Sequence, residues 1–356
     1  MLPLQQAREV RDSIIEYIKA TFKFKEKDVS DAFYRFIESK EDGLFKGPYI
    51  SLKTPFVSAS EEESRNIPLE IVPNFPPYLH QLQAFRQLSV QNGNEPKPTL
   101  LTTGTGSGKT ECFLYPILDY CYNCNKFNRQ VGVKVIILYP MNALASDQAK
   151  RLAETIWNDS RLKGKVTAGL FVGEGTDPKG YPRDMGPDHI IENRDAILDT
   201  VPDILLTNFK MLDYGLMRQR FSSLWKGNID TDFKALKFIV LDELHTYDGA
   251  QGTDVANLIR RLKLKLDLTE GQLCPVGTSA TIGSGKDSKV LLRKYASDVF
   301  GENFDSDSVI VEDRIEVKDI GTVCHLPDLD WKILMINIFV ASVNCGICRI
   351  LVLQKD

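Results

Sequence analysis

The stretch TLLTTGTGSGKT, Thr99–Thr110, decides the fold of this chain. The apolar run TLLT leads into a glycine-rich turn, and a helical pattern follows. Glycines let the backbone curl so that several N–H groups point at one anion, which is how phosphate is bound at the start of a helix. Lys109 adds a positive charge for the β- and γ-phosphates, and the Thr110 hydroxyl can ligate magnesium. The stretch therefore predicts a site for ATP and Mg²⁺ formed by Thr103, Gly104, Thr105, Gly106, Ser107, Gly108, Lys109 and Thr110, with Thr103 standing where the strict pattern has glycine.

Further apolar runs surround this loop along the chain. They are short and continuous rather than alternating, which is typical of strands buried on both faces of a parallel sheet. Helical patterns fill the stretches between them. The sequence therefore predicts an α/β core in which helices flank a parallel sheet. The runs lie at 135–139, 168–172, 203–207, 238–241 and 275–279.

The first 75 residues differ from this core. Residues 6–22 have apolar side chains at helical spacing, and a second helix is expected to begin at Ser30 as its N-cap. Residues 44–57 read as an extended arm, and the polar, proline-rich stretch 60–77 indicates a boundary. We expect an accessory region over 1–75, the nucleotide-binding domain over 76–300 and an incomplete linker or tail over 301–356.

A pair of acids follows the apolar run FIVL in the segment LDELH, Leu241–His245. An acid at the end of a buried strand beside a phosphate loop is the usual second holder of magnesium, which assigns Asp242 that role together with Thr110. Glu243 is placed to orient or deprotonate the water that attacks the γ-phosphate. Alone, such a pair more often marks a solvated helix start. Its place after a buried strand makes it a candidate catalytic pair.

The order of three segments carries a family resemblance. GSGKT comes first, DELH second and SAT, Ser279–Thr281, third, and this ordered set resembles superfamily 2 helicases. The resemblance implies a RecA-like P-loop NTPase fold, ATP hydrolysis and Lys109, Asp242, Glu243 and His245 as the catalytic set. It also implies that Ser279 and Thr281 couple nucleotide state to movement. His245 would sense that state across a domain interface, although a packed, hydrogen-bonded histidine is an equal reading.

The same resemblance extends to other segments. Gln81, in YLHQ, matches the glutamine that reads the adenine edge in these helicases, with Gln83 as the second choice. YPMNALASDQ (139–148) and TN (207–208) resemble the segments that grip the nucleic-acid backbone, although each is also readable as a plain loop. Loops at strand ends can present amides and hydroxyls to phosphates without reading sequence. The implied contacts are Pro140, Asn142, Ala143, Thr207 and Asn208.

Within the superfamily, YPMNALASDQ and DELHTYDGAQGTDVANLIRRL (242–262) resemble the large bacterial DExH helicases of mitomycin repair and defence islands. That group favours DNA over RNA as the partner, single- or double-stranded. The formal net charge of −4 argues against a broadly basic surface, but a local patch and backbone amides can still hold phosphates.

Such helicases hydrolyse ATP between two RecA-like domains, and the second supplies arginines worth roughly 10³–10⁵ in rate in related enzymes. The residues after Thr281 contain no segment of the type Q-x-x-G-R-x-x-R. The composition also changes abruptly after Trp331, where an uncharged stretch begins at Ile333. We therefore interpret the chain as a truncated or split gene product that turns over slowly, whose second motor domain a separate polypeptide could supply.

Two other classes stay open from the sequence. One is a non-catalytic nucleic-acid-binding or regulatory remnant of such a helicase. The other is a small-molecule kinase, which the phosphate loop alone would permit but the acid pair followed by SAT disfavours. Seven cysteines without framework spacing indicate reduced thiols, no signal peptide or membrane span is evident, and a cytoplasmic location is expected.

Overall fold

The computed structural model describes residues 3–39, 43–45, 54–104, 106–127, 130–173, 180–279 and 287–316. Thr105 and Thr281, both expected in the site, lie outside these ranges, as does the uncharged stretch after Ile333. Contacts divide the chain into two compact units, Met1–Pro55 and Phe56–Asp356. Within the described residues, no helix has the length and apolar character needed to cross a membrane.

The first unit contains two helices. Helix α1 spans Pro3–Thr21 and helix α2 spans Lys27–Glu38. Lys19 of α1 pairs with Glu38 of α2 at 2.5 Å. Helix α2 begins three residues before the predicted start, with Glu26 in the N-cap position. The prediction of a Ser30 N-cap was wrong, because the Ser30 amide already bonds to the Glu26 carbonyl and so belongs to the first turn.

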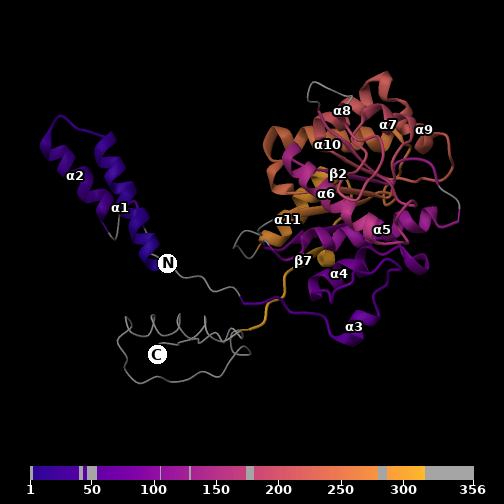
Figure 1. Cartoon of the computed structure of the whole chain (residues 1–356), viewed down its shortest axis with the longest axis horizontal. Coiled ribbons are helices and arrows are strands. Elements are labelled where there is room, and N and C mark those ends of the chain that lie inside the picture. Colours follow the sequence, from indigo (N-terminus) through magenta and orange to yellow (C-terminus); the bar gives the residue numbers. More distant parts are fainter. Residues whose placement is uncertain are drawn as a thin grey trace. The chain divides into compact units, whose positions relative to one another are not determined.

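The second unit is built on a sheet with helices packed around it (Figure 1). The sheet has seven strands in the order β3-β4-β2-β5-β6-β1-β7. All neighbouring strands are parallel, as the continuous apolar runs predicted. Every residue in β1 to β6 is buried, which follows from helices covering both faces of the sheet. The strands are β1 Thr99–Thr102, β2 Val135–Leu138, β3 Ala168–Phe171, β4 Ile204–Thr207, β5 Phe238–Leu241, β6 Cys274–Ser279 and β7 Val309–Val311.

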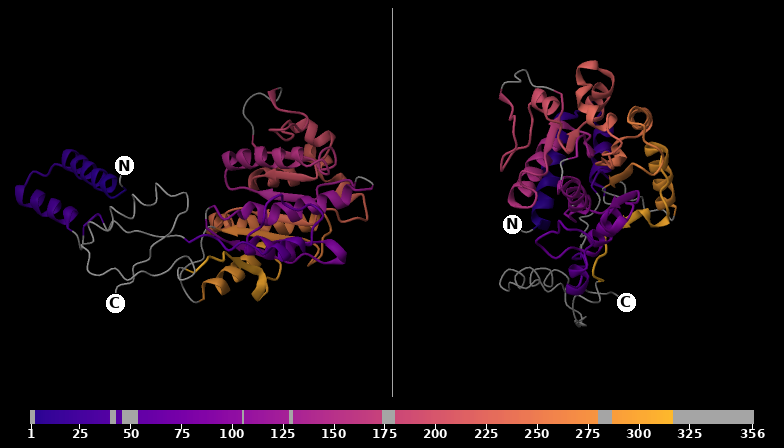
Figure 2. Two further views of the ribbon diagram at one scale, coloured as in Figure 1. Left: turned by 60° about the horizontal axis from the view of Figure 1, so that its bottom comes forward. Right: turned by 90° about the vertical axis from the view of Figure 1, so that its right-hand side faces the viewer.

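Helices pack on both faces of this sheet (Figure 2). One apolar core joins the sheet to α4 Leu79–Leu88, α5 Lys109–Asn125 and α6 Asn142–Asn158. The other core joins it to five further helices, which are α7 Arg194–Asp199, α8 Phe209–Met217, α9 Ser223–Ile229, α10 Gly249–Lys265 and α11 Ser288–Phe300. A short helix, α3 Glu61–Arg65, precedes α4 and begins with a capping box formed by Ser60 and Glu63.

The unit boundaries differ from those expected at residues 75 and 300. The backbone of Phe56 pairs with Arg314 and that of Ser58 with Tyr78, so the end of the arm is attached to the sheet domain. Strand β7 lies beyond residue 300 yet pairs with β1 from Leu100 to Thr102. Both segments therefore belong to the core, because their backbone hydrogen bonds are made with it.

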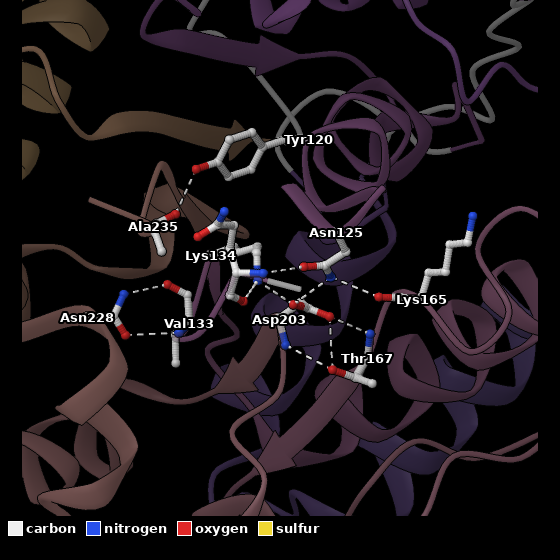
Figure 3. A network of polar contacts seen from close by, with 10 residues as sticks. Tyr120, Asn125, Val133, Lys134, Lys165, Thr167, Asp203, Asn228 and Ala235 are labelled. Carbon is white, nitrogen blue, oxygen red and sulfur yellow. Dashed lines mark hydrogen bonds and ion pairs between the residues drawn. The ribbon is translucent and has the colours of Figure 1, made fainter. Parts of the chain in front are cut away.

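The amino ends of β2 and β4 enclose a buried polar network (Figure 3). The Lys134 ammonium group, fully buried, pairs with Asp203 at 2.5 Å. Asp203 also accepts bonds from Asn125 at 3.0 Å and from the amide and hydroxyl of Thr167 at 2.8 and 2.9 Å. This many partners offset the cost of burying both charges. Because the strands are parallel, the network lies at the edge of the sheet opposite the phosphate loop.

Candidate nucleotide and nucleic-acid site

The predicted motifs gather at the carboxyl edge of the sheet. The phosphate loop follows β1, the acid pair follows β5, and Ser279 ends β6, which lies between those two strands. The segments beginning at Pro140 and Asn208 follow β2 and β4, the next strands along the same edge. Parallel strands place all their carboxyl ends together, so segments far apart in sequence become neighbours, and ligands bind at this edge in open α/β sheets.

The phosphate loop is held in its curled form by its own side chains. Gly106 and Gly108 have φ values of +79° and +73°, a region that side chains disfavour. The Ser107 hydroxyl contacts that of Thr103 at 2.6 Å and the Gly104 carbonyl at 2.8 Å. Helix α5 begins at Lys109, directly after the loop. Its free amides and its dipole face the place where an anion would lie.

Two residues of α4 hold the loop from behind. The Gln81 side chain, 2% exposed, donates to the Gly108 carbonyl at 3.2 Å and accepts from the Tyr78 amide at 2.9 Å. His80 is fully buried, and its Nε2 lies 2.8 Å from the Ser107 carbonyl. Burial lowers the pKa of His80, so the ring is neutral and Nε2 carries the donated proton. Gln83 is exposed, which leaves Gln81 as the glutamine beside the loop.

Asp242 is positioned by Thr278, the residue before the last one of the neighbouring strand β6. The Thr278 hydroxyl donates to Asp242 Oδ1 at 2.5 Å and accepts from the Glu243 amide at 3.0 Å. Burial raises the pKa of Asp242, and the charge of Glu243 raises it further, whereas Thr278 and Lys109 act in the opposite direction. Thr278 thereby joins β6 to both acids.

Glu243 lies between the loop and the end of β6. Its Oε1 is 3.7 Å from Lys109 Nζ and its Oε2 is 3.4 Å from His245 Nδ1. The same ring nitrogen of His245 lies 3.2 Å from the Ser279 hydroxyl. Glu243 has φ +52°, an unusual backbone for a non-glycine residue, and such strain is found at functional sites. The structure thus brings Lys109, Glu243, His245 and Ser279 together in one chain of contacts.

The residues present fit a magnesium nucleotide. Glu243 Oε2 is buried and makes no hydrogen bond among the described residues, so its capacity to accept a proton is unused. Thr110 and Asp242 are oxygen donors, which Mg²⁺ prefers alongside phosphate oxygens and water. No cluster of three or more His, Cys, Asp or Glu side chains suited to a metal occurs in the described ranges.

The two segments expected to grip nucleic acid meet through their asparagines. Asn208 caps α8 by accepting from the Met211 amide at 2.9 Å, and its Nδ2 donates to Asn142 Oδ1 at 2.7 Å. Asn142 and Ala143 are exposed at the start of α6, and Pro140 is half-buried. Thr207 differs, because its side chain is fully buried and its hydroxyl bonds to the Phe171 carbonyl. Its hydroxyl therefore serves the sheet and does not face the surface.

Residues that the sequence did not single out also contact the predicted ones. They are Thr278, His80, and Glu312, which follows β7 and accepts a hydrogen bond from the Gly104 amide. Thr278 and His80 stand next to motif residues, so proximity in sequence was an available signal. Glu312 gave none, because it lies 208 residues from Gly104 and only the pairing of β7 with β1 brings it there.

The sequence profile of the DEAD/DEAH box helicases matches residues 78–288, which is more than half of the chain and includes all three motifs. The chain belongs to the DEAD/DEAH box helicase family. Its sheet, with the phosphate loop after β1 and the DELH segment after β5, is the RecA-like motor domain of that family, whose members are ATP-dependent helicases.

Several relatives match over part of their length. The Druantia protein DruE of Escherichia coli is 27% identical, over 63% of this chain and 17% of DruE. The ATP-dependent helicase YprA of Bacillus subtilis is 32% identical, over 59% of this chain and 23% of YprA. A solved structure of the helicase MrfA bound to DNA is 25% identical with a TM-score of 0.48, over 73% of this chain and 30% of MrfA. The chain thus spans less than a third of the length of these relatives.

Proposed function

We propose that residues 56–316 form the first motor domain of a helicase that uses ATP and Mg²⁺ to move on nucleic acid, with DNA favoured over RNA. The observation that carries this proposal is the row of motifs along one sheet edge, with Thr278 and Ser279 of β6 between the phosphate loop and the acids. The Thr278 hydroxyl contacts both Asp242 and Glu243, so it is placed to transmit a change at the nucleotide to strand β6.

Each residue has a role in this proposal. The loop amides and Lys109 bind the phosphates, Gln81 reads the adenine edge and also supports the loop through the Gly108 carbonyl, and Thr110 and Asp242 would hold Mg²⁺. Bound there, the ion would neutralise charge on the β- and γ-phosphates. Glu243 Oε2, buried and without a hydrogen bond in the described part of the chain, is the acceptor for the proton of the attacking water.

The nucleic-acid contacts in this proposal are backbone contacts. The exposed residues Asn142 and Ala143 and the amides at the starts of α6 and α8 suit phosphate oxygens, which carry no sequence information. The preference for DNA rests on the likeness of YPMNALASDQ and the 242–262 segment to the mitomycin-repair and defence helicases. The four described cysteines are free, which suits a cytoplasmic enzyme.

ATP turnover by residues 56–316 without a second motor domain is proposed to be slow. These residues contain one RecA-like sheet, and helicases of this kind take the arginines that stabilise the transferring phosphoryl group from a second one.

A phosphate-release assay with and without single-stranded DNA, and with RNA of the same sequence, tests the proposal. We expect tight binding of an ATP analogue that requires Mg²⁺, little release by the chain alone, and a larger response to DNA than to RNA. Nucleic-acid binding without any nucleotide binding would instead favour a non-catalytic remnant. Fast turnover by the chain alone would contradict the proposed need for a second domain.

A further inference from the structure

We propose that Glu312 and Arg314 are positioning residues of the ATP site, and that the Glu312 carboxylate fixes the first turn of the phosphate loop before nucleotide binds. This inference rests on the proposed function, since it concerns the same loop. It adds a segment after residue 300 that the sequence alone assigned to a linker or tail.

The pairing of strands brings Glu312 to the loop. Thr102 pairs with Val311, so the residues that follow, Thr103 and Glu312, leave the sheet side by side. The Gly104 amide donates to Glu312 Oε2. A Cβ atom added at Gly104 would lie 3.1 Å from that same oxygen, so the carboxylate is seated directly against the glycine. The Gly104 amide is thereby already satisfied by the protein.

Arg314 holds the carboxylate in place. Its Nε donates to Glu312 Oε1 at 2.6 Å, so the two carboxylate oxygens have different partners. The Arg314 guanidinium group also lies 4.1 Å from the centre of the Phe56 ring, within the range of a cation–π contact. Because Phe56 pairs with Arg314 through the backbone, the arm and the end of β7 support each other.

Phe56 also links Arg314 to the α4 residues that contact the other end of the loop. Phe56 packs against Tyr78 and His80 with ring centres 5.2 and 5.7 Å apart. His80 and Gln81 contact the carbonyls of Ser107 and Gly108. Glu312 completes this set at the other end of the loop, where it holds an N–H group instead of a carbonyl. The loop is therefore fixed at both ends from outside.

Charge must be separated from geometry in any test. Glu312 alone would repel a triphosphate, whereas the Glu312–Arg314 pair is neutral. Two double variants remove the pair without changing the net charge. Glu312→Ala/Arg314→Ala removes the acceptor, and Glu312→Gln/Arg314→Gln keeps an amide oxygen that can still accept from Gly104. The two double variants differ in whether residue 312 can accept a hydrogen bond from the Gly104 amide. Both leave Lys109, Asp242 and Glu243 intact.

The measurement is titration of the full chain with a fluorescent N-methylanthraniloyl-ATP in Mg²⁺, with thermal unfolding by circular dichroism as the folding control. We expect the alanine double variant to bind about tenfold more weakly, as for loss of one hydrogen bond to a charged group. The glutamine double variant is expected to bind within about threefold of the wild type. Equal affinity of the alanine variant and the wild type would overturn the inference, as would equal loss in both variants.

A second measurement covers the case in which the alanine variant does not fold. Selective ¹⁵N-glycine labelling of the wild type allows hydrogen exchange of the Gly104 amide to be followed without nucleotide. Slow exchange supports the proposed bond, and exchange at the rate of an open loop overturns it. If the wild type itself fails to bind the ATP analogue, the proposed function fails, whereas binding with unaffected variants removes the role of Glu312 alone.

Discussion

Thr278 and Asp242 are joined by a hydrogen bond of 2.5 Å that crosses from β6 to the end of β5. The same hydroxyl accepts from the Glu243 amide, so one side chain contacts the carboxylate of the acid proposed to hold Mg²⁺ and the backbone of the acid proposed to be catalytic. Thr278 is fully buried. It is therefore placed to fix both acids, not to touch a ligand.

Replacement of Thr278 by valine tests this relationship. The change keeps the shape of the side chain and removes the hydroxyl, so Asp242 loses a bond that favours its charged form. We expect the affinity for an ATP analogue in Mg²⁺ to fall about tenfold, in line with one lost bond to a charged group. Thr278→Ser keeps the hydroxyl and is expected to bind normally. If Thr278→Val and Thr278→Ser bind the ATP analogue equally well, the hydroxyl does not contribute to binding and the prediction is wrong.

The pKa of Asp242 leads to a prediction about pH. Burial and Glu243 raise that pKa above its ordinary value of 3.8, and Mg²⁺ requires the deprotonated form. Affinity for the magnesium nucleotide is therefore expected to fall on acidification, with a midpoint above the ordinary value. Isothermal titration over a pH series measures this. A midpoint that does not move in Thr278→Val, where a group that lowers the pKa is lost, would contradict the assignment.

The raised pKa of Asp242 also predicts that removing its charge will stabilise the fold. With a folded-state pKa above the unfolded one, the folded protein binds more protons between the two values, so stability is lost as pH rises through that window. At neutral pH the charged Asp242 is thus a cost. Asp242→Asn is expected to raise the thermal midpoint, by roughly 2–4 °C for each kcal/mol relieved, while weakening magnesium-dependent binding. A lower midpoint in this variant would count against the argument.

Gly108 carries two constraints at once. It has φ +73°, and a Cβ atom there would collide with Gln81 Nε2, which bonds to the Gly108 carbonyl. Gly108→Ala is therefore expected to displace Gln81 and weaken ATP binding at least tenfold, beyond a strain of about 1–2 kcal/mol. Gly164→Ala, at φ +75° with open space around its Cβ, isolates the strain. That control should lose stability and keep its affinity for ATP.

Loss of the buried Lys134 charge should destabilise the fold and leave the site unchanged. Lys134→Met leaves Asp203 charged and buried without its cation, which costs about 3–5 kcal/mol for pairs of this kind. Adding Asp203→Asn removes that charge and keeps one oxygen, which suffices because both Thr167 bonds go to the same atom, so part of the loss should return. Urea unfolding measures the free energies. No recovery in the double variant would mean that packing, not charge, sets the cost.

The sheet could be predicted from the sequence because its strands are short apolar runs buried on both faces. The runs at 99–102 and 238–241 coincide with β1 and β5, and the others agree to within one residue at either end. Strand β7 was missed because only three residues, VIV, form it, and its place depends on pairing with β1. The residues on either side of β7 do not extend its apolar run, so the sequence pattern did not indicate a strand there.

The site was predictable where residue type and local spacing determine the chemistry. The loop and the acid pair met at one edge because both follow strands, and Gln81 reached the loop because it begins a helix packed on α5. Thr278 could not be distinguished from Ser279 by type, since both are small hydroxyl residues at one strand end. Which of them points at Asp242 depends on the alternation of side chains along β6, known only once the register is known.

Glu312 could not be found from sequence at all. A glutamate after a three-residue apolar run resembles any solvated acid, and its contact with Gly104 arises from strand order. The burial of the Thr207 hydroxyl was unpredictable for a related reason. Its hydroxyl bonds to the Phe171 carbonyl on β3, a strand whose place beside β4 is a property of the whole sheet.

The Asn208–Asn142 bond has a mechanical consequence. Because Asn208 also caps α8, the starts of α6 and α8 are tied to each other and to the ends of β2 and β4. A polynucleotide held there would contact two helix starts that this bond links, so the two starts would move together as one platform. Any stepping along the strand must then come from displacement of this platform relative to a different body, and the length of a step is set outside this domain.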